Sequence, residues 1–321
     1  MAFLFPRLRR VIDAICDPMS YRLLQYARAN RLMPLKDCAA DLRPSGEFGV
    51  PDISEDEIVR NASQIPKIIF QTWKSHFDMP ANYGYWRTSF LRNNPTYRCF
   101  LWDDSDNRNF IAGRFSWFLD RYDSYPREIL RADIIRLFFL YTYGGFYADM
   151  DSECVRPLDA MRGMGDVLLG RMGRDRQFEH AIPNAIMASK SRQALWLLTI
   201  AFAVERLAEF QADNQKSRIE WLTGPVLLKD AVDFYMSHKT AEIRDRISKS
   251  CPELAKEVSR SNFGKIQLLP SKVWYPINWN NFLHTILRKK MFSENAVVDQ
   301  ADLSRLFPQA YIVTYWTASW K

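Results

Sequence analysis

Residues Arg127–Pro157 read REILRADIIRLFFLYTYGGFYADMDSECVRP, and this stretch decides the fold. Its first half, Glu128–Tyr143, is apolar almost all round, which is typical of a buried helix. Gly144 and Gly145 predict the end of that helix, because glycine adopts a left-handed cap without strain. Residues 146–151 then alternate with a period of two, which predicts a strand with one face toward the core and one toward a ligand.

The predicted helix carries two charged residues, Asp133 and Arg136, on one face, and buried charges are costly unless they are paired or face a ligand. Tyr147, Asp149 and Asp151 share one face of the predicted strand, with the Cα atoms of the two acids roughly 7 Å apart at about 3.3 Å per residue. We therefore expect Asp151 to hold a hard divalent cation, while Asp149 acts through water or on substrate hydroxyls. Arg136 adds positive charge for a diphosphate.

Two segments of this stretch resemble a known family. Residues 133–136 (DIIR) and 143–151 (YGGFYADMD) look like the signature of DxD-containing sugar transferases. That family includes the yeast initiating α-1,6-mannosyltransferases, the mannosyltransferases acting on inositol phosphorylceramide, bacterial capsular-polysaccharide enzymes and, more distantly, the large clostridial glucosylating toxins. The resemblance extends to residues 65–74 (IPKIIFQTWK) and 316–320 (WTASW), so it covers residues 65–321.

The resemblance implies an α/β fold, a nucleotide-binding sandwich of the glycosyltransferase A type with helical additions. It implies a Mn²⁺- or Mg²⁺-dependent enzyme that transfers a sugar from UDP-hexose or GDP-mannose to a hydroxyl of a glycan or lipid-linked acceptor, with retention of the anomeric configuration. The alternatives are a protein-modifying glycosyltransferase like the toxins, a metal-dependent phosphohydrolase and a non-catalytic carbohydrate-binding protein.

The resemblance also implies roles for individual residues. Asp133 and Asp149 would orient ribose and sugar hydroxyls. Asp151 would hold the metal, and Arg136 would neutralise charge on the departing diphosphate. Front-face attack, in which the leaving phosphate takes the proton of the acceptor, needs no dedicated base. The residues implied to surround the nucleotide sugar are Phe70, Gln71, Thr72, Trp73, Asp133, Arg136, Tyr147, Asp149, Asn184, Trp316, Ser319 and Trp320.

Several positions keep two interpretations. Trp73 either stacks on the nucleotide base or fills the core. Thr223 and Gly224 either offer backbone donors to the acceptor or only begin a helix. The aromatic residues near the C-terminus either form platforms for sugar rings or fill the core. These aromatic residues are Trp274, Tyr275 and Trp279.

The C-terminal segment departs from the family pattern. Family members commonly carry one or two histidines directly before the tryptophan that corresponds to Trp316, and one of them helps to hold the metal. Thr314 and Tyr315 stand there in this chain. A phenol is a poor ligand for these cations at neutral pH, since its pKa is about 10. The candidates for a third ligand are Ser319, the hydroxyl of Tyr315, and water.

Apolar runs outside this stretch predict further strands and helices. Strands are expected at residues 66–72, 97–102, 166–171, 185–189 and 266–269. Helices are expected at residues 195–210, 226–235 and 241–258. They lie in a mostly helical region, residues 191–260, which would carry the acceptor side. Asp103, Asp104 and Asp106 are predicted to cap a helix.

We divide the chain into an N-terminal helical extension with a linker, residues 1–53, and a catalytic domain, residues 54–321. Residues 8–33 carry amphipathic helices with several arginines, which either pack on the domain or lean on an anionic membrane surface. Residues 41–53 are rich in proline and glycine, which predicts the linker. The basic run at 287–291 (LRKKM) is predicted to be solvated.

Composition limits the function classes. The chain has 321 residues, is 47% hydrophobic and carries a net charge of +7, which suits a globular protein with acidic partners such as nucleotide phosphates. No zinc-finger spacing or RNA-binding signature points to nucleic acid. The five cysteines include no CxxC pair, and no segment approaches the ~18 apolar residues of a membrane span. A cytoplasmic, reducing location is therefore expected.

Overall fold

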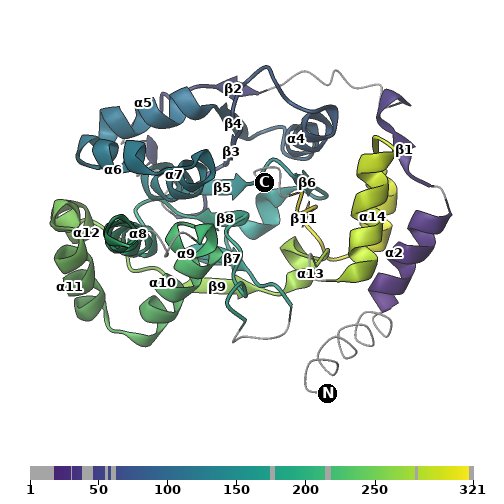
Figure 1. Ribbon diagram of the computed structural model, residues 1–321. Helices are drawn as coiled ribbons and strands as arrows, with labels where there is room; N and C mark the ends of the chain where they lie inside the picture. The colour runs from purple at the N-terminus through teal and green to yellow at the C-terminus, as the bar shows by residue number, and fades with distance from the viewer. Residues whose placement is uncertain are drawn as a thin grey trace.

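The structure is a computed structural model that describes residues 18–29, 31–37, 46–54, 57–58, 63–173, 178–213, 218–278 and 281–317. Its centre is a seven-stranded sheet with the order β2-β4-β3-β5-β8-β7-β9 (Figure 1). The strands are β2 (Glu47–Phe48), β3 (Ile68–Thr72), β4 (Arg98–Trp102), β5 (Gly145–Ala148), β7 (Val167–Gly170), β8 (Ile186–Ser189) and β9 (Ile266–Leu269). The predicted α/β class is confirmed.

Every strand of this sheet except β8 runs in the same direction, because β8 pairs antiparallel with both β5 and β7. All residues of β3, β5, β7 and β8 are buried, as expected for a sheet that is covered on both faces. The strands predicted from apolar runs are present with ends shifted by one or two residues.

Helices cover both faces of the sheet (Figure 1). Phe70 of β3 points into the aromatic core shared with α5 and α7, while its neighbour Ile69 packs on the opposite face, in the core that includes Phe90 of α4 and Trp274 of α13. The helices around the sheet are α4 (Ala81–Asn93), α5 (Asp104–Arg114), α6 (Leu119–Ser124), α7 (Glu128–Tyr143), α8 (Ala194–Ala212), α9 (Ile219–Leu222), α10 (Pro225–Ser237) and α13 (Ser271–Trp274).

The helix predicted at residues 241–258 is wrong as a single element. The structure has α11 (Thr240–Ser250), a short 3₁₀ turn at Pro252–Leu254 and α12 (Ala255–Ser259). Pro252 explains the break, because proline lacks an N–H group and disfavours helical backbone at the residue before it.

The N-terminal segment packs against the C-terminal part of the chain. Helix α2 (Pro18–Arg28) packs against α14 (Phe282–Ser293), and β1 (Met33–Pro34) pairs antiparallel with β10 (Ala296–Val297) (Figure 1). In the residues that the structure describes, the N-terminal extension therefore packs on the domain, which was one of the two alternatives. Among the described residues, no helix combines the length and apolar content that crossing a bilayer requires.

Part of the predicted linker belongs to the sheet, which corrects the prediction for residues 41–53. Strand β2 pairs parallel with β4, so residues 47–48 form its edge. The glycines on either side, Gly46 and Gly49, have positive φ angles of 100° and 78°. They let the chain turn into and out of this short edge strand.

A second, two-stranded sheet joins residues 312–314 to the segment that follows β5. Strand β6 (Ser152–Cys154) pairs antiparallel with β11 (Ile312–Thr314), which follows α15 (Gln300–Leu306). The Tyr315 N–H then donates to the carbonyl oxygen of Asp151 over 2.8 Å. Residues 315–317 consequently lie beside the turn that carries Asp149 and Asp151.

Candidate active site

Helix α7 places a charged pair in the interior, as its sequence predicts. Asp133 is 6% exposed and Arg136 is 3% exposed, and Nη2 of Arg136 lies 2.9 Å from Oδ1 of Asp133. The glycines after the helix have positive φ angles, 67° at Gly144 and 96° at Gly145. A side chain at Gly145 would collide with the backbone of Ile68 in β3, so this glycine lets α7 run directly into β5.

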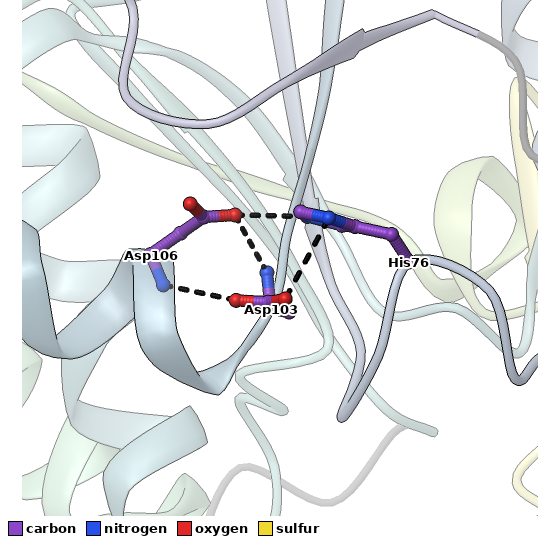
Figure 2. A group of neighbouring side chains, drawn as sticks. All are labelled: His76, Asp103 and Asp106. Atoms are coloured by element: carbon purple, nitrogen blue, oxygen red, sulfur yellow. Dashed lines mark hydrogen bonds and ion pairs between the residues drawn. The ribbon is translucent and has the colours of Figure 1, made fainter.

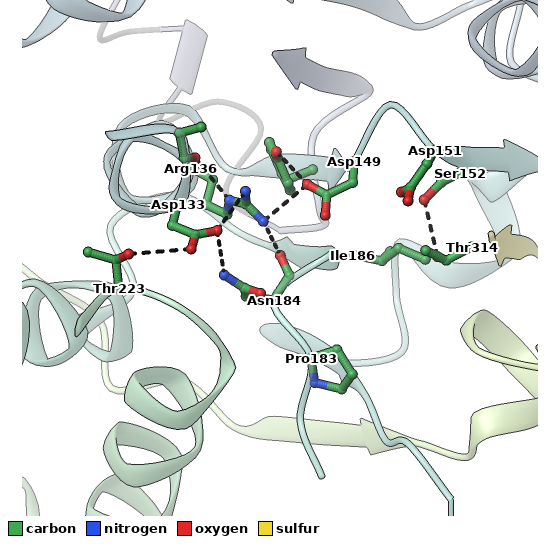
Figure 3. Close-up of polar contacts among 12 residues, drawn as sticks. Asp133, Arg136, Asp149, Asp151, Ser152, Pro183, Asn184, Ile186, Thr223 and Thr314 are labelled. Carbon is green, nitrogen blue, oxygen red and sulfur yellow. Dashed lines mark hydrogen bonds and ion pairs between the residues drawn. The ribbon is translucent and has the colours of Figure 1, made fainter. Parts of the chain in front are cut away.

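Arg136 connects α7 to the residues that follow β5 (Figure 3). Its Nη1 lies 3.1 Å from Oδ1 of Asp149 and donates to the carbonyl oxygen of Asn184 over 2.8 Å. Its Nε donates to the carbonyl oxygen of Ala132 over 3.1 Å, and the guanidinium lies 4.5 Å from the centre of the Tyr147 ring. In this arrangement Arg136 contacts two carboxylates, and its contact with a diphosphate stays a prediction.

Asp133 is held from three separate parts of the chain (Figure 3). Besides Arg136, it accepts hydrogen bonds from Nδ2 of Asn184 at 2.9 Å and from the Thr223 hydroxyl at 3.3 Å. Burial raises the pKa of Asp133 to about 6, although the charge of Arg136 opposes that shift. This network fixes Asn184, a predicted sugar contact, through both its side chain and its backbone.

Thr223 and Gly224 lie between the end of α9 and the start of α10. Their backbone N–H groups both donate to the carbonyl oxygen of Ile219, over 3.1 and 3.2 Å, and Gly224 is the residue before α10. The alternative in which these N–H groups serve the acceptor is therefore wrong. The segment instead contacts the charged network through the Thr223 hydroxyl, which sequence reasoning missed.

Asp149 and Asp151 lie on a turn, which corrects the predicted strand at residues 146–151. Strand β5 ends at Ala148, and the Ser152 N–H donates to the carbonyl oxygen of Asp149 over 3.0 Å. The chain leaves the large sheet here because residues 152–154 pair with β11. The separation of roughly 7 Å assumed for a continuous strand therefore does not apply.

Both acids have specific partners in the turn. The side chain of Asp149 is 31% exposed, and its Oδ1 accepts a hydrogen bond of 2.8 Å from the Tyr147 hydroxyl. Asp151 accepts two hydrogen bonds on one oxygen, Oδ2, from the N–H and the hydroxyl of Thr317, at 2.7 and 3.1 Å. Burial, together with the charge of Asp149, raises the pKa of Asp151 to about 6. A bound cation would favour the ionised form of both groups.

The donor chemistry of this turn fits a hard divalent cation, since carboxylate oxygens are the ligands that Mg²⁺ and Mn²⁺ prefer. Of the predicted third ligands, Tyr315 is wrong because its side chain is buried away from the turn. Its hydroxyl donates to Oε2 of Glu153 over 2.6 Å, and its ring stacks 4.5 Å from that of Trp86. Ser319 lies outside the described residues, so it and water stay predictions.

A cavity of about 880 Å³ opens in front of the turn and of α7. The sequence-predicted residues in its wall are Thr72, Trp73, Asp133, Arg136, Tyr147, Asp149, Asp151, Asn184 and Trp316. Trp73 is partly exposed, donates from Nε1 to the carbonyl oxygen of Asp78 over 2.7 Å and packs 4.8 Å from the Tyr83 ring. Trp73 therefore lines the cavity, and its stacking on the nucleotide base stays a prediction.

Phe70 and Gln71 do not reach this cavity, which corrects their predicted place in the nucleotide pocket. Phe70 is fully buried, with ring centres of Phe139 and Phe100 at 5.3 and 5.7 Å. Gln71 is also fully buried and accepts a hydrogen bond of 2.9 Å from Nη1 of Arg87. Of β3, only the C-terminal residue Thr72 reaches the cavity, because ligands of open α/β sheets bind at the carboxyl ends of the strands.

The aromatic residues near the C-terminus divide between core and cavity. Trp274 and Tyr275 are buried, which settles their alternative in favour of the core. Trp316 lines the cavity, and its Nε1 donates to the carbonyl oxygen of Ile277 over 2.6 Å. Trp279, Ser319 and Trp320 lie outside the described residues.

Besides Thr223, the structure adds two residues that sequence reasoning missed. Thr317 holds Asp151, and Arg288 lines the cavity. The predicted solvation of the run at 287–291 holds only for Lys289, since Leu287 and Met291 are buried and Lys290 is half-buried. No local pattern marks Thr317 or Arg288. Their proximity to the turn depends on the pairing of β6 with β11. These two strands are far apart in the sequence, since Ser152 pairs with Thr314.

A second acidic cluster lies at the start of α5 (Figure 2). Ligand-type atoms of His76, Asp103 and Asp106 lie within 4.8 Å of one another. Oδ1 of Asp103 accepts the N–H groups of Ser105 and Asp106, at 2.9 and 3.0 Å, and Oδ2 of Asp106 accepts the Asp103 N–H at 3.1 Å. This capping box confirms the predicted helix cap. Nε2 of His76 lies 2.8 Å from the same Oδ2.

Comparison with known proteins gives a consistent group of relatives. Residues 80–168 match the family described as "Glycosyltransferase sugar-binding region containing DXD motif". Inositol phosphoceramide mannosyltransferase 3 of Schizosaccharomyces pombe is 46% identical over 113 residues, 35% of this chain and 32% of that protein. Inositol phosphoceramide mannosyltransferase 2 of the same yeast is 33% identical over 196 residues, 56% of each chain.

A weaker match is also to a protein named as a mannosyltransferase. The initiation-specific alpha-1,6-mannosyltransferase of Candida albicans is 26% identical over 152 residues, 43% of this chain and 40% of that protein. The chain thus spans about half or less of the length of these relatives. Among solved structures, the PaToxG glycosyltransferase aligns over 80% of this chain and 94% of its own, with 16% identity and a TM-score of 0.38.

Proposed function

We propose that this chain, whose residues 80–168 match the glycosyltransferases with a DXD-containing sugar-binding region, transfers a hexose from a nucleotide diphosphate sugar to a hydroxyl group. One observation carries the proposal: the matched segment contains α7 and the Asp149–Asp151 turn, and both face one cavity of about 880 Å³. A cavity of this size accommodates a nucleotide sugar.

The names of the relatives support mannose as the transferred sugar and a glycolipid or glycan as the acceptor. We therefore propose GDP-mannose as the first donor to test and UDP-hexoses as the second. A lipid-linked acceptor would reach the protein at a membrane surface. The exposed basic residues Arg22 and Arg28 of α2 and Lys289 of α14 would favour peripheral contact with anionic lipid there.

The roles of the acids follow from their surroundings. Asp151 would hold a divalent cation, because its carboxylate lies in the cavity wall and Thr317 fixes it through a single oxygen. Asp149 would contact the donor through its exposed part while Arg136 and Tyr147 fix its orientation. When bound, the cation would supply Lewis-acid stabilisation of the diphosphate. Asp133 keeps Asn184 and Arg136 in place around the sugar.

We propose that transfer proceeds with retention, with the leaving phosphate accepting the proton of the acceptor hydroxyl. The resemblance to the DxD transferases supports this mechanism, which requires no side-chain base. Glu128, His180 and Glu220 also line the cavity, and one of them would serve as the base in an inverting reaction. The anomeric configuration of the product, measured by NMR before it equilibrates, distinguishes the two mechanisms.

A donor panel tests the proposed function. The protein is incubated with Mn²⁺ and each of several UDP- and GDP-sugars, and free sugar, nucleoside diphosphate and inorganic phosphate are measured. Slow release of free sugar with the nucleoside diphosphate is expected, since glycosyltransferases transfer sugar to water when no acceptor is present. Release of inorganic phosphate alone would identify a phosphohydrolase, and no turnover with retained binding would identify a carbohydrate-binding protein.

A further inference from the structure

The charges around the Asp149–Asp151 turn do not balance a diphosphate. Three carboxylates, those of Asp133, Asp149 and Asp151, surround the guanidinium of Arg136, which contacts two of them directly. A divalent cation at Asp151 would offset the remaining negative charge of the protein. It would leave the charge of the diphosphate itself without a protein counterpart. A further cation on the side of the turn away from α7 would supply that counterpart.

Arg288 occupies that position. It lies on α14, lines the same cavity, and interacts electrostatically with Asp151. Of the other cationic wall residues, Lys74 lies 2.9 Å from Asp78, while Arg127 and Arg131 lie on the α7 side, at the residue before this helix and in its first turn.

The contacts of Arg288 hold it beside the metal-binding turn. Nη1 donates to the carbonyl oxygens of Trp316 and Tyr315, at 3.1 and 3.4 Å, and Nη2 donates to the Thr285 hydroxyl at 3.2 Å. The next residue in this segment, Thr317, donates to the carboxylate of Asp151. Arg288 and Asp151 are thus fixed to the same three-residue stretch of backbone.

Arg288 also retains hydrogen-bonding capacity. A guanidinium has five N–H donors, and the buried Nε of Arg288 has no hydrogen-bond acceptor within the described part of the chain. A buried donor without an acceptor is unfavourable, so the Nε of Arg288 calls for a partner such as a water molecule or a ligand. The fork geometry of the guanidinium matches phosphate oxygens.

We infer that Arg288 binds the β-phosphate of the nucleotide sugar and stabilises it as the leaving group. This inference rests on the proposed function. In the reaction, the bond between the anomeric carbon and the phosphate oxygen breaks, with its electron pair going to that oxygen. The acceptor hydroxyl oxygen bonds to the anomeric carbon, and its proton passes to the departing diphosphate. The N–H groups of Arg288 donate to the oxygens on which the negative charge develops.

The test compares Arg288→Gln with Lys289→Gln, which removes the same charge from the exposed neighbouring position of α14. Calorimetry measures the affinity of each protein for GDP and GMP, and for UDP and UMP, in the presence of Mn²⁺. Arg288→Gln should weaken diphosphate binding roughly 10- to 100-fold, the range for a hydrogen bond to a charged group, and change monophosphate binding much less. Lys289→Gln should leave both affinities unchanged.

The contrasting outcomes are distinct. Equal loss for monophosphate and diphosphate, together with a lower Tm, would show that Arg288 only holds the Trp316 carbonyl and would overturn the inference. Unchanged diphosphate affinity in Arg288→Gln would overturn it as well. If the unmodified protein binds neither GDP nor UDP, the proposed function fails and the inference falls with it.

Discussion

Two clusters of acidic side chains follow β4 and β5, the two strands that flank β3, and their surroundings differ. His76, Asp103 and Asp106 gather at the start of α5, where carboxylate oxygens accept backbone N–H groups of the same helix turn (Figure 2). Asp149 and Asp151 follow β5 in a turn that faces a large cavity (Figure 3). Their partners are side chains and backbone from distant segments.

The comparison shows that proximity of acids does not define a metal site. In the α5 cluster the carboxylates already neutralise the N-terminal end of a helix, so their local bonds explain why they are there. In the turn after β5, burial and mutual repulsion keep the pKa of Asp151 at about 6, above the ordinary value for an aspartate. That cost of ionisation is what a bound cation would offset.

The largest expected difference between the clusters is in activity. Asp151→Asn should lower donor turnover by roughly 10³-fold or more, equivalent to about 4 kcal/mol of transition-state stabilisation, because the cation would lose its main ligand. Asp106→Asn, the matched change in the α5 cluster, should leave turnover within about twofold. Steady-state assays of both variants, with circular dichroism as a control for folding, provide the measurement. Near-normal turnover in Asp151→Asn would refute the assignment.

The next effect is on stability. Arg136→Gln leaves the buried Asp133 and the partly buried Asp149 without their counter-charge, which should lower the free energy of unfolding by about 3–5 kcal/mol. Arg108→Gln is the surface control, because Arg108 pairs with Asp123 in solvent at 2.7 Å, and its loss should lower the free energy of unfolding far less. Urea unfolding monitored by tryptophan fluorescence measures both. Equal, small effects would contradict the structural role assigned to Arg136.

A smaller effect tests the α5 cluster itself. Asp103→Ala removes the side chain that caps the helix and should lower the free energy of unfolding by about 1 kcal/mol, within the usual range of 0.5–2 kcal/mol. Its affinity for Mn²⁺, measured by calorimetry, should equal that of the unmodified protein. A marked loss of Mn²⁺ binding would show instead that this cluster is a metal site.

The smallest effect concerns Asp104, the first residue of α5. Burial and the charge of Glu128 raise its pKa to about 6. Because this pKa exceeds the ordinary value of about 3.9, the folded state holds the proton more tightly, and Asp104 lowers stability as the pH rises from about 4 through about 6. Asp104→Asn should remove that loss, a gain of less than about 1 kcal/mol at pH 8 after solvent screening. Thermal unfolding at pH 4.5 and pH 8 checks the sign.

The sequence predicts the parts of the site that depend on local physics. Helix α7, its glycine end and the buried Asp133–Arg136 pair follow from hydrophobic pattern and the conformational freedom of glycine. The end of β5 was not predictable, because residues 152–154 leave the sheet to pair with β11, a long-range choice that no local pattern encodes.

The same limit explains the other corrections. Every residue of β3 is buried, so the apolar run does not show which of its residues face the ligand. The sequence therefore predicts Phe70 and Gln71 in the pocket together with Trp73. Thr317 and Arg288 reach Asp151 through tertiary pairing of the C-terminal segment. Residues contributed by a distant segment become visible only when the strand partners are known.

The central claim is that a divalent cation binds at the turn carrying Asp149 and Asp151 and meets the diphosphate there. Crystals grown with Mn²⁺ and GDP or UDP, measured at the manganese absorption edge, test it most directly. The account predicts an anomalous peak beside Asp151, with the diphosphate between the metal and Arg288. A peak at the His76, Asp103 and Asp106 cluster, with no metal at the turn, would contradict it.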